Sequence, residues 1–364
     1  MSYKKKIVIS FLLILILFSE EILACTGIRL KAEDGGVVSG RTVEFGSDIE
    51  MSIAVIPRHY RFVGNVPKGK GMPYQSKYAA IGIYCFDEQV LMDGINEKGL
   101  VAAAFYFPGY AEYANITQAN ISQALSPVEF PNWILTQFAT IAEVKAALKS
   151  VVIAPTIIQS WGETPPPMHY IVYDAAGESL VIEPLNGTLV LYDNPIGVFT
   201  NSPAFGWHLT NLCNYINLSV YNVDSISLQG LKLTPFGQGS GLVGLPGDFT
   251  PPSRFIRAAI FSTSSISIKH AEEAVSQAFH ILNQFDIPAG AVREKEKTGF
   301  SYDSTLLTSV KDPSSLRYYY RSYNDQAIRY IDLNQFDPNS TSIHHRKVNG
   351  SQKALDVSAL LIAE

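Results

Sequence analysis

Cys25 is the residue of this sequence whose type and position best suit covalent chemistry. It follows a segment, residues 1–24, that resembles an export signal, so cleavage after Ala24 would leave Cys25 at the N-terminus. An N-terminal cysteine carries a nucleophilic sulfur and an α-amine whose pKa is roughly 7.7–8.0. That amine can accept the thiol proton, directly or through water. We therefore expect a cysteine nucleophile that uses its own amine as the general base.

The segment before Cys25 has the features of a signal peptide. Lys4, Lys5 and Lys6 form a basic start, and an apolar run from Ile7 to Phe18 follows. This run is shorter than the about 20 residues that a bilayer-spanning helix needs. The sequence therefore predicts a signal peptide that is removed, export to the periplasm or the medium, and no stable membrane insertion after processing. A membrane anchor is the alternative.

The same cysteine allows an interpretation from a different functional class. Ile22-Leu23-Ala24-Cys25 loosely resembles the lipobox of lipoproteins, although Leu23 is larger than the residue usual at that place. Lipidation would consume the sulfur and usually cap the amine. A lipid-anchored binding protein and an N-terminal cysteine enzyme therefore exclude each other. Cys25 as an incidental buried thiol is a third possibility.

Blocks of sequence along the rest of the chain carry a family resemblance. They are Cys25–Leu30, Gly40–Glu44, Asp93–Leu100, Phe105–Tyr110, Thr200–Pro203, Gly237–Asp248 and Ser253–Phe255. In this order they resemble the choloylglycine hydrolase and penicillin V acylase family of N-terminal-nucleophile hydrolases, from Cys25 to about Arg257 and more loosely beyond. The resemblance implies an enzyme that hydrolyses a linear, non-peptide C–N amide without a cofactor. It also implies an α+β fold, a four-layer αββα sandwich, and commonly a homotetramer.

The resemblance further implies roles for individual residues. Cys25 would be the nucleophile, with Arg41 beside it to hold the thiolate and Arg254 to orient it and polarise the site. A cation near the sulfur is expected to lower the thiol pKa. The side-chain amide of Asn201 and the backbone N–H of Tyr106 would hold the oxyanion, where one lost donor costs about 10²–10³ in rate.

Two positions depart from the common pattern of the family. Glu44 stands where many members have an aspartate; it keeps the carboxylate but is one methylene longer, so its hydrogen bond to the α-amine can be placed differently. Tyr106 is asparagine in typical bile salt hydrolases and tyrosine in some penicillin V acylases, which favours a penicillin V acylase-like substrate. Conjugated bile salts and N-acyl homoserine lactones remain alternatives. We expect Val43, Phe86 and Tyr106 to contact the substrate.

Composition and the remaining motifs exclude several classes of protein. The chain has 364 residues, a formal net charge of −5, 17% charged and 47% hydrophobic residues, which argues against disorder and coiled coils. Without a basic block, nucleic acid is not an expected partner. Gly239–Gly244 matches a dinucleotide-binding pattern, but Pro246 and Pro251 follow where that pattern needs a helix. The spacing of histidines and cysteines predicts no metal site.

Apolar runs and alternation predict how the chain folds around these residues. Strands are expected at 28–30, 36–41, 51–57, 79–85, 101–105, 170–173, 179–183, 188–192, 304–309, 316–323 and 327–333. Helices are expected at 132–149, 204–216, 253–263 and 270–283. This order favours sheets between helical layers in a single catalytic domain, residues 25–364. His208 is expected on a helix surface, with an approach to the site near Asn201 as the alternative. His344–His345 is expected in a solvated tail. Cys85 and Cys213 are expected as buried free thiols, with a disulfide as the alternative.

Overall fold

The structure is a computed structural model that describes residues 24–358 except 47–48, 68, 86–88, 296–298 and 349. Two antiparallel sheets form the centre of the protein. The first sheet contains, in spatial order, β1 (Cys25–Lys31), β2 (Val37–Phe45), β17 (Phe300–Asp312), β18 (Arg317–Ser322) and β19 (Asp325–Asp332), with β16 (Val292–Lys295) paired to β17. The second sheet contains β13 (Thr188–Asp193), β12 (Ser179–Leu185), β11 (Met168–Tyr173), β8 (Val101–Tyr106), β7 (Asp93–Asn96), β6 (Ala80–Cys85), β3 (Met51–Ile56) and β20 (His344–Lys347).

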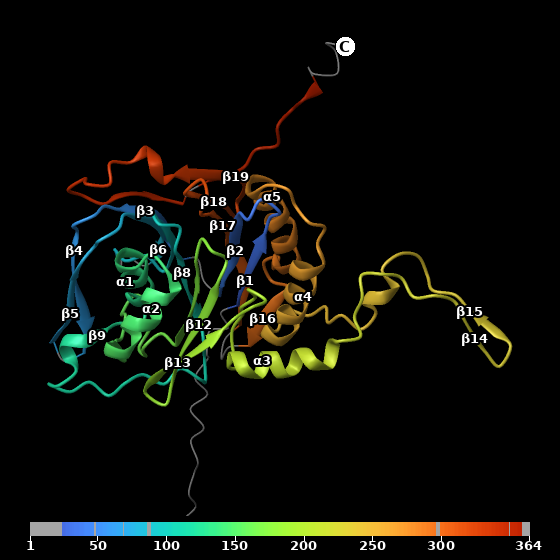
Figure 1. Cartoon of the computed structure of the whole chain (residues 1–364), viewed down its shortest axis with the longest axis horizontal. Helices are drawn as coiled ribbons and strands as arrows, with labels where there is room; N and C mark the ends of the chain where they lie inside the picture. The colour runs from blue at the N-terminus through green and yellow to red at the C-terminus, as the bar shows by residue number, and fades with distance from the viewer. Residues whose placement is uncertain are drawn as a thin grey trace, which may run out of the picture.

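Helices cover the outer faces of both sheets (Figure 1). On the second sheet, α1 (Phe130–Gln137) packs on β7 and β8, and α2 (Ile141–Ala147) follows it. On the first sheet, α4 (Pro251–Ser264) packs on β1, and α5 (Ala271–Leu282) packs on β2 and β17. The short α3 (Phe205–Leu212) packs against α4. The predicted α+β architecture, a four-layer αββα sandwich, is confirmed.

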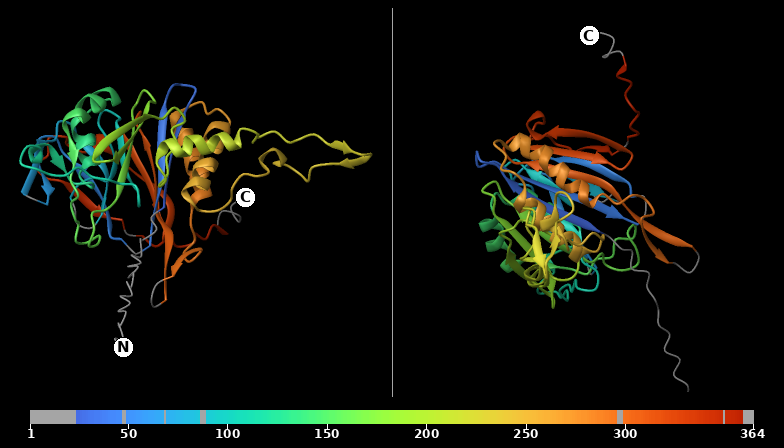
Figure 2. Two further views of the ribbon diagram at one scale, coloured as in Figure 1. Left: turned by 90° about the horizontal axis from the view of Figure 1, so that it is seen from below. Right: turned by 90° about the vertical axis from the view of Figure 1, so that its right-hand side faces the viewer.

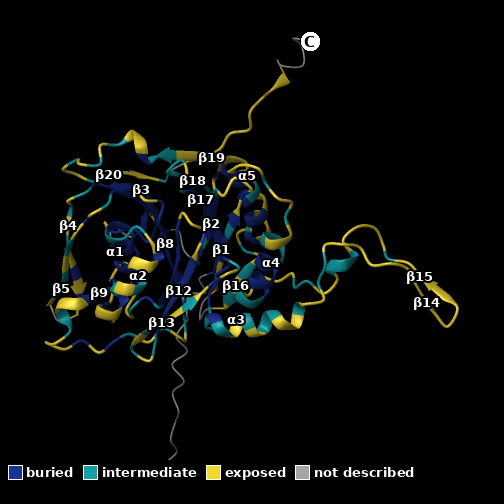
Figure 3. Ribbon diagram, viewed as in Figure 1, coloured by how far each residue is buried: buried dark blue, intermediate teal, exposed yellow. Residues whose placement is uncertain are grey.

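Burial on both faces explains why the central strands are so apolar. Every residue of β3, β6 and β7 is buried, because one face meets the other sheet and the other face meets helices or loops. Figure 3 shows this buried centre, with exposed residues on the helices and loops around it. The few polar side chains inside this centre must therefore find partners there.

Part of the predicted secondary structure is wrong. The single helix expected at 132–149 is two helices, because the chain leaves the helix at Phe138 and Thr140 caps a new one, its side chain accepting a hydrogen bond from the Glu143 N–H at 3.2 Å. The solvated tail expected at His344–His345 is strand β20, which pairs antiparallel with β3. Helix α4 begins at Pro251, which is tolerated in the first turn.

The cysteine prediction is half right. All three cysteines are free thiols, and Cys85 is buried as expected. Cys213, however, is exposed, because it follows α3 on a turn that is not covered by another element.

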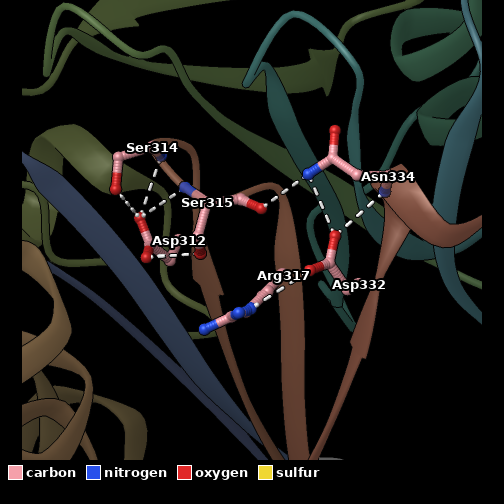
Figure 4. Close-up of polar contacts among 6 residues, drawn as sticks. All are labelled: Asp312, Ser314, Ser315, Arg317, Asp332 and Asn334. Atoms are coloured by element: carbon pink, nitrogen blue, oxygen red, sulfur yellow. Dashed lines mark hydrogen bonds and ion pairs between the residues drawn. The ribbon is translucent and has the colours of Figure 1, made fainter.

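A tight turn joins β17 to β18 and shows how local polar contacts shape the sheet (Figure 4). Asp312 accepts hydrogen bonds from the Ser314 N–H at 2.9 Å and the Ser315 hydroxyl at 2.6 Å. Arg317 then donates to Asp332 on β19 at 3.3 Å, which ties β18 to the end of the next strand. The contacts of Asp312 with Ser314 and Ser315, which follow it in the turn, are those of an Asx turn.

Several short strands lie outside the two main sheets. They are β4 (Arg61–Val66) with β5 (Gly69–Gln75), β9 (Ala124–Leu125) with β10 (Val152–Ile153), and β14 (Ile226–Leu228) with β15 (Leu231–Leu233). The β14–β15 hairpin is the tip of a long arm that projects from the body, as Figure 1 and the left view of Figure 2 show. Within the described part of the chain, no helix is long and apolar enough to cross a membrane.

Candidate active site

Cys25 begins β1, and its neighbours follow from the antiparallel pairing of β1 with β2. In this register Cys25 lies opposite Val43, and Gly27 lies opposite Arg41. Because side chains alternate between the faces of a strand, the Cys25 and Arg41 side chains share the face that meets the second sheet. Glu44 points to the other face, towards the helices. The Cys25 sulfur and the Glu44 carboxylate therefore lie on opposite faces of the first sheet.

Arg41 contacts the sulfur directly. Its Nη2 lies 2.9 Å from Cys25 Sγ, and its Nη1 donates to the carbonyl of Ala104 on β8 at 2.7 Å. The guanidinium also lies over the ring of Phe105, 4.0 Å from the ring centroid. A Cβ at Gly27 would lie 3.0 Å from that ring, so a residue without a side chain suits this place. Arg41 therefore lies beside Cys25, as the sequence predicts, and the second sheet holds its guanidinium in place.

Asn201 reaches Cys25 through a short bridge between its segment and β1. The N–H of Gly27 donates to the Phe199 carbonyl at 2.7 Å, and the N–H of Phe199 donates back to Gly27 at 3.0 Å. Moving two residues along each antiparallel segment places Asn201 opposite Cys25. The backbone N–H of Cys25 indeed donates to Asn201 Oδ1 at 2.7 Å. Removal of residues 1–24 would convert this peptide nitrogen into the α-amine.

Tyr106, at the end of β8, presents its backbone to the same place. Asn201 Nδ2 donates to the Tyr106 carbonyl at 2.8 Å. The next residue, Phe107, donates its N–H to Pro167 at 2.7 Å on the opposite edge of the strand. Since backbone groups alternate between the edges of a strand, the Tyr106 N–H points to the edge that faces Asn201. One hydrogen of the Asn201 amide nitrogen is used by Tyr106, and a second hydrogen remains on that nitrogen.

Arg254, from α4, is completely buried and binds the backbone of Cys25. Its Nη1 donates to the Cys25 carbonyl and, at 2.8 Å, to the Thr26 hydroxyl. Its Nη2 donates to Asn201 Oδ1 at 2.8 Å. One planar guanidinium therefore contacts both Cys25 and Asn201.

Glu44 lies opposite Thr305 of β17 and is 1% exposed. Its Oε1 accepts a hydrogen bond from the Thr305 hydroxyl at 3.2 Å, and its Oε2 has no hydrogen-bond partner among the described residues. Burial raises the Glu44 pKa from 4.5 to about 8, although the Arg254 charge lowers it. In the chain that still carries Ala24, this carboxyl is therefore protonated at neutral pH.

Burial also has the largest effect on the pKa of the Cys25 thiol. It raises the pKa of the Cys25 thiol above its ordinary value of 9.0, against the lowering effects of Arg41 and Arg254. The two arginine charges do lower the thiol pKa, but burial raises it by more. The expectation that the Cys25 pKa lies below its ordinary value is therefore wrong. The thiol therefore needs a base at neutral pH.

Glu44 provides a prediction about stability and pH. In the unprocessed chain, the native Glu44 keeps its proton up to about pH 8 whereas the unfolded residue loses it near pH 4.5. The native state binds more protons in this window, so the free energy of unfolding should fall as pH rises, by up to about 1.4 kcal/mol per pH unit. Urea unfolding between pH 5 and 8 measures it. Glu44→Gln should lack this decrease, and an identical pH dependence of the two proteins would contradict the assignment.

Of the expected substrate contacts, two lie at the site. Val43 is half-buried opposite Cys25, and the Tyr106 side chain is also half-buried at the end of β8. Phe86 lies outside the described residues. No cluster of three or more histidine, cysteine or acidic side chains suited to a metal occurs in the described part of the chain.

The site agrees with the comparisons with known proteins. The profile of the linear amide C–N hydrolases, choloylglycine hydrolase family, matches residues 25–345. The chain belongs to the choloylglycine hydrolase family. A bile salt hydrolase/transferase of Clostridium perfringens is 36% identical over 89% of this chain and 97% of its own length. Another, from Lactiplantibacillus plantarum, is 32% identical over 88% and 95%.

Solved structures show the same fold. A crystal structure of a variant of the conjugated bile acid hydrolase of Clostridium perfringens has a TM-score of 0.81 and 35% identity, covering 92% of this chain and all of that one. A penicillin V acylase of Agrobacterium tumefaciens has a TM-score of 0.72 at 21% identity, covering 89% and 91%, which shows the fold alone. This family member is therefore a hydrolase acting on linear amides, with the fold of N-terminal-nucleophile hydrolases.

The sequence did not predict all of the residues that support the site. His208, for which a helix surface is the favoured expectation and an approach to the site the alternative, is 2% exposed, and its Nε2 lies 2.9 Å from the Asn201 carbonyl. His169 and Glu183 form a buried pair, and His169 contacts the backbone of Thr200, the residue before Asn201. The available signal was a histidine inside the apolar run Met168–Tyr173 and a glutamate inside the next one, since charged groups are rarely buried without a partner.

Proposed function

We propose that the protein cleaves its amide substrate with the Cys25 sulfur, after removal of residues 1–24. One observation carries this proposal: the sulfur, the Cys25 nitrogen and the Asn201 amide converge on one place. Cys25 Sγ lies 2.9 Å from Arg41 Nη2, and the Cys25 nitrogen lies 2.7 Å from Asn201 Oδ1. Cleavage would turn that nitrogen into a base attached to the nucleophile itself.

The steps balance without a cofactor. The α-amine of Cys25 takes the thiol proton, and the sulfur attacks the amide carbonyl. The oxyanion accepts hydrogen bonds from Asn201 Nδ2 and the Tyr106 N–H. The C–N bond then breaks as the α-ammonium protonates the leaving amine, which leaves a thioester on Cys25. Finally water, deprotonated by the α-amine, attacks the thioester and releases the acid and the free thiol.

Processing and export are part of the proposal. The basic and apolar composition of residues 1–24 favours an exported protein that starts at Cys25 and forms one catalytic domain, residues 25–364. Strand β2 pairs with β17, and β3 pairs with β20, so strands from the two ends of the chain share each sheet. This pairing supports the single domain. Intact mass and N-terminal sequencing of the mature protein test the processing. An unmodified start at Cys25 is expected, and a diacylglyceryl mass on that residue would contradict it.

We further propose that the substrate is a conjugated bile acid. The support is that relatives 28–36% identical over nearly the whole chain carry the names bile salt hydrolase or conjugated bile acid hydrolase. Tyr106 keeps penicillin V as the second candidate, because its side chain lies beside the oxyanion site, where typical bile salt hydrolases have an asparagine. N-acyl homoserine lactones are the third.

A panel of the three amides tests this assignment. We expect glycine- or taurine-conjugated cholate to give the highest kcat/KM, measured by release of the free amine. Tyr106→Asn is the informative variant: it keeps the backbone N–H, so a changed preference would come from the side chain. A clear preference of the wild-type protein for penicillin V or for a lactone amide would replace the bile acid assignment. Cys25→Ala provides the blank for every substrate.

The homotetramer is also a proposal, and the projecting arm supports it. Apolar side chains along the arm are largely exposed, including Tyr221 at 80%, Ile226 at 62%, Leu231 at 64% and Phe236 fully. An isolated two-stranded hairpin is at best marginally stable in water, and contiguous exposed apolar surface marks a site of association. We therefore expect a second copy of the chain to cover the arm.

Sedimentation velocity tests the role of the arm. The wild-type protein should sediment as a tetramer, and the triple variant Ile226→Ser, Leu228→Ser and Leu231→Ser should shift to smaller species. Ile266→Ser is the matched control, because Ile266 is 90% exposed on the body and away from the arm. A monomeric wild-type protein, or a triple variant that remains tetrameric, would contradict the proposal.

A further inference from the structure

Two buried histidines bind consecutive backbone carbonyls of the segment that carries Asn201. His169 Nε2 lies 2.9 Å from the carbonyl oxygen of Thr200, and His208 Nε2 lies 2.9 Å from that of Asn201. The two imidazoles come from different elements, β11 and α3. Because a carbonyl oxygen can only accept a hydrogen bond, each Nε2 must carry a hydrogen.

The other ring nitrogen of His169 contacts Glu183 on β12, the strand paired with β11. His169 Nδ1 lies 3.1 Å from Glu183 Oε1, and both side chains are at most 1% exposed. Since Nε2–H already binds Thr200, one proton must lie between Nδ1 and Oε1, on either atom. The same Oε1 accepts the Phe205 N–H at 2.9 Å, at the start of α3. Glu183 thereby joins the histidine to the helix that carries His208.

Aromatic rings hold both imidazoles in place. The His169 ring stacks on Phe107 with centroids 4.1 Å apart and planes at 11°. The His208 ring stacks on Phe255, 4.7 Å away and at 17°, and Phe255 follows the site residue Arg254 on α4. Burial lowers the His208 pKa to about 4, against the raising effects of the Asn201 and Pro203 backbone groups, so its ring is neutral near pH 7.

We propose that His169, held by Glu183, and His208 are positioning residues that fix the backbone of Thr200 and Asn201, and thereby aim the Asn201 amide at the oxyanion. Neither histidine acts on the substrate itself. A displacement of about 1 Å of a reacting group can cost about 10²-fold in rate. The effect should therefore appear in kcat rather than in KM, because the oxyanion forms only after the substrate is bound.

Ring-conserving variants test this role. His208→Phe and His169→Phe keep an aromatic ring but remove the N–H donor, so we expect kcat to fall about 10- to 100-fold with a nearly unchanged KM. His208→Gln keeps an amide N–H and should recover much of the loss. Glu183→Gln can keep only one of the two contacts of Oε1, the donation to Nδ1 or the acceptance of the Phe205 N–H, so it should lose part of the activity. Glu183→Ala loses both contacts and should lose more. Phenylalanine variants that are folded and keep wild-type kcat would overturn the proposal.

Tyr170→Phe is the matched control. Tyr170 follows His169 on β11, is fully buried, and donates its hydroxyl to the Pro127 carbonyl at 2.9 Å, outside the site. Its loss should lower stability and leave kcat close to wild type. If Tyr170→Phe lowers kcat as much as the histidine variants do, the effect is general loosening of the fold and the positioning role is wrong.

A measurement on the wild-type protein keeps the inference testable should the phenylalanine variants fail to fold. Nitrogen chemical shifts of ¹⁵N-labelled histidine report the tautomer of each ring. We expect Nε2–H for His208, and the Nδ1–H tautomer would overturn its assignment. The inference rests on the proposed oxyanion role of Asn201. A wild-type kcat in Asn201→Ala would remove that role, whereas a loss in Asn201→Ala without a loss in His208→Phe would remove only this inference.

Discussion

Replacing Cys25 by alanine is expected to lower kcat by about 10⁴-fold or more, because no other atom in the scheme can form the covalent acyl bond. The substitution removes only Sγ and its 2.9 Å contact with Arg41. The backbone contacts of residue 25 with Asn201 and Arg254 do not involve the sulfur, so the fold should survive. Steady-state turnover together with circular dichroism measures both properties.

Two variants make the interpretation of this loss specific. Cys25→Ser keeps the size and the position of the side chain but supplies a weaker nucleophile, so it should also be severely impaired. Cys85→Ala removes the other buried thiol and should leave kcat near wild type, even if stability falls. Substantial turnover by Cys25→Ala would end the proposed mechanism, although the membership in the hydrolase family would stand.

Asn201→Ala is the second substitution with a large expected effect. It removes the proposed oxyanion donor, and the loss of one such donor costs about 10²–10³ in kcat in comparable sites. KM should change less, since the substrate carbonyl needs this donor mainly in the transition state. Michaelis–Menten kinetics separate the two constants. The same change also leaves Arg254 Nη2 without the Oδ1 acceptor that it has at 2.8 Å, so some loss of stability is expected.

Asn194→Ala is the matched control for Asn201. Asn194 is equally buried, at 1% exposed, and its Nδ2 donates to the Val198 carbonyl at 2.9 Å in the segment that leads to Asn201. It touches no group of the site, so its replacement should lower stability and leave kcat largely intact. A pure increase in KM for Asn201→Ala, or equal losses of kcat in both variants, would remove Asn201 from the oxyanion site.

The long central elements could be predicted because their sequence signal is local. An apolar run such as Tyr170–Tyr173 or Ala79–Cys85 contains enough β-branched and aromatic residues to indicate a buried strand. The break of the predicted helix at Phe138 could not be predicted from periodicity, because the apolar spacing continues across it. The capping contact of Thr140 is what starts the second helix.

Strand β20 shows the same limit at the other end of the chain. His344–Lys347 is polar and exposed, so nothing in its composition indicates a strand. It is a strand because the edge of β3 offers unpaired backbone groups to which it can bind. His208 is a further case: one histidine on a helix is expected to face solvent, and only the packing of α3 on α4 buries it.

By itself, the sequence determined the residue types on which the proposed chemistry depends. The type of residue 25, its place after a leader-like segment, and the ordered blocks with Arg41, Asn201 and Arg254 are properties of the chain alone. Tertiary structure decided how these groups behave. The distance from Cys25 to Arg41, the protonation of Glu44 and the histidines behind Asn201 depend on segments far apart in the sequence. Burial and charge act through space, and the order of residues does not state which segments will meet.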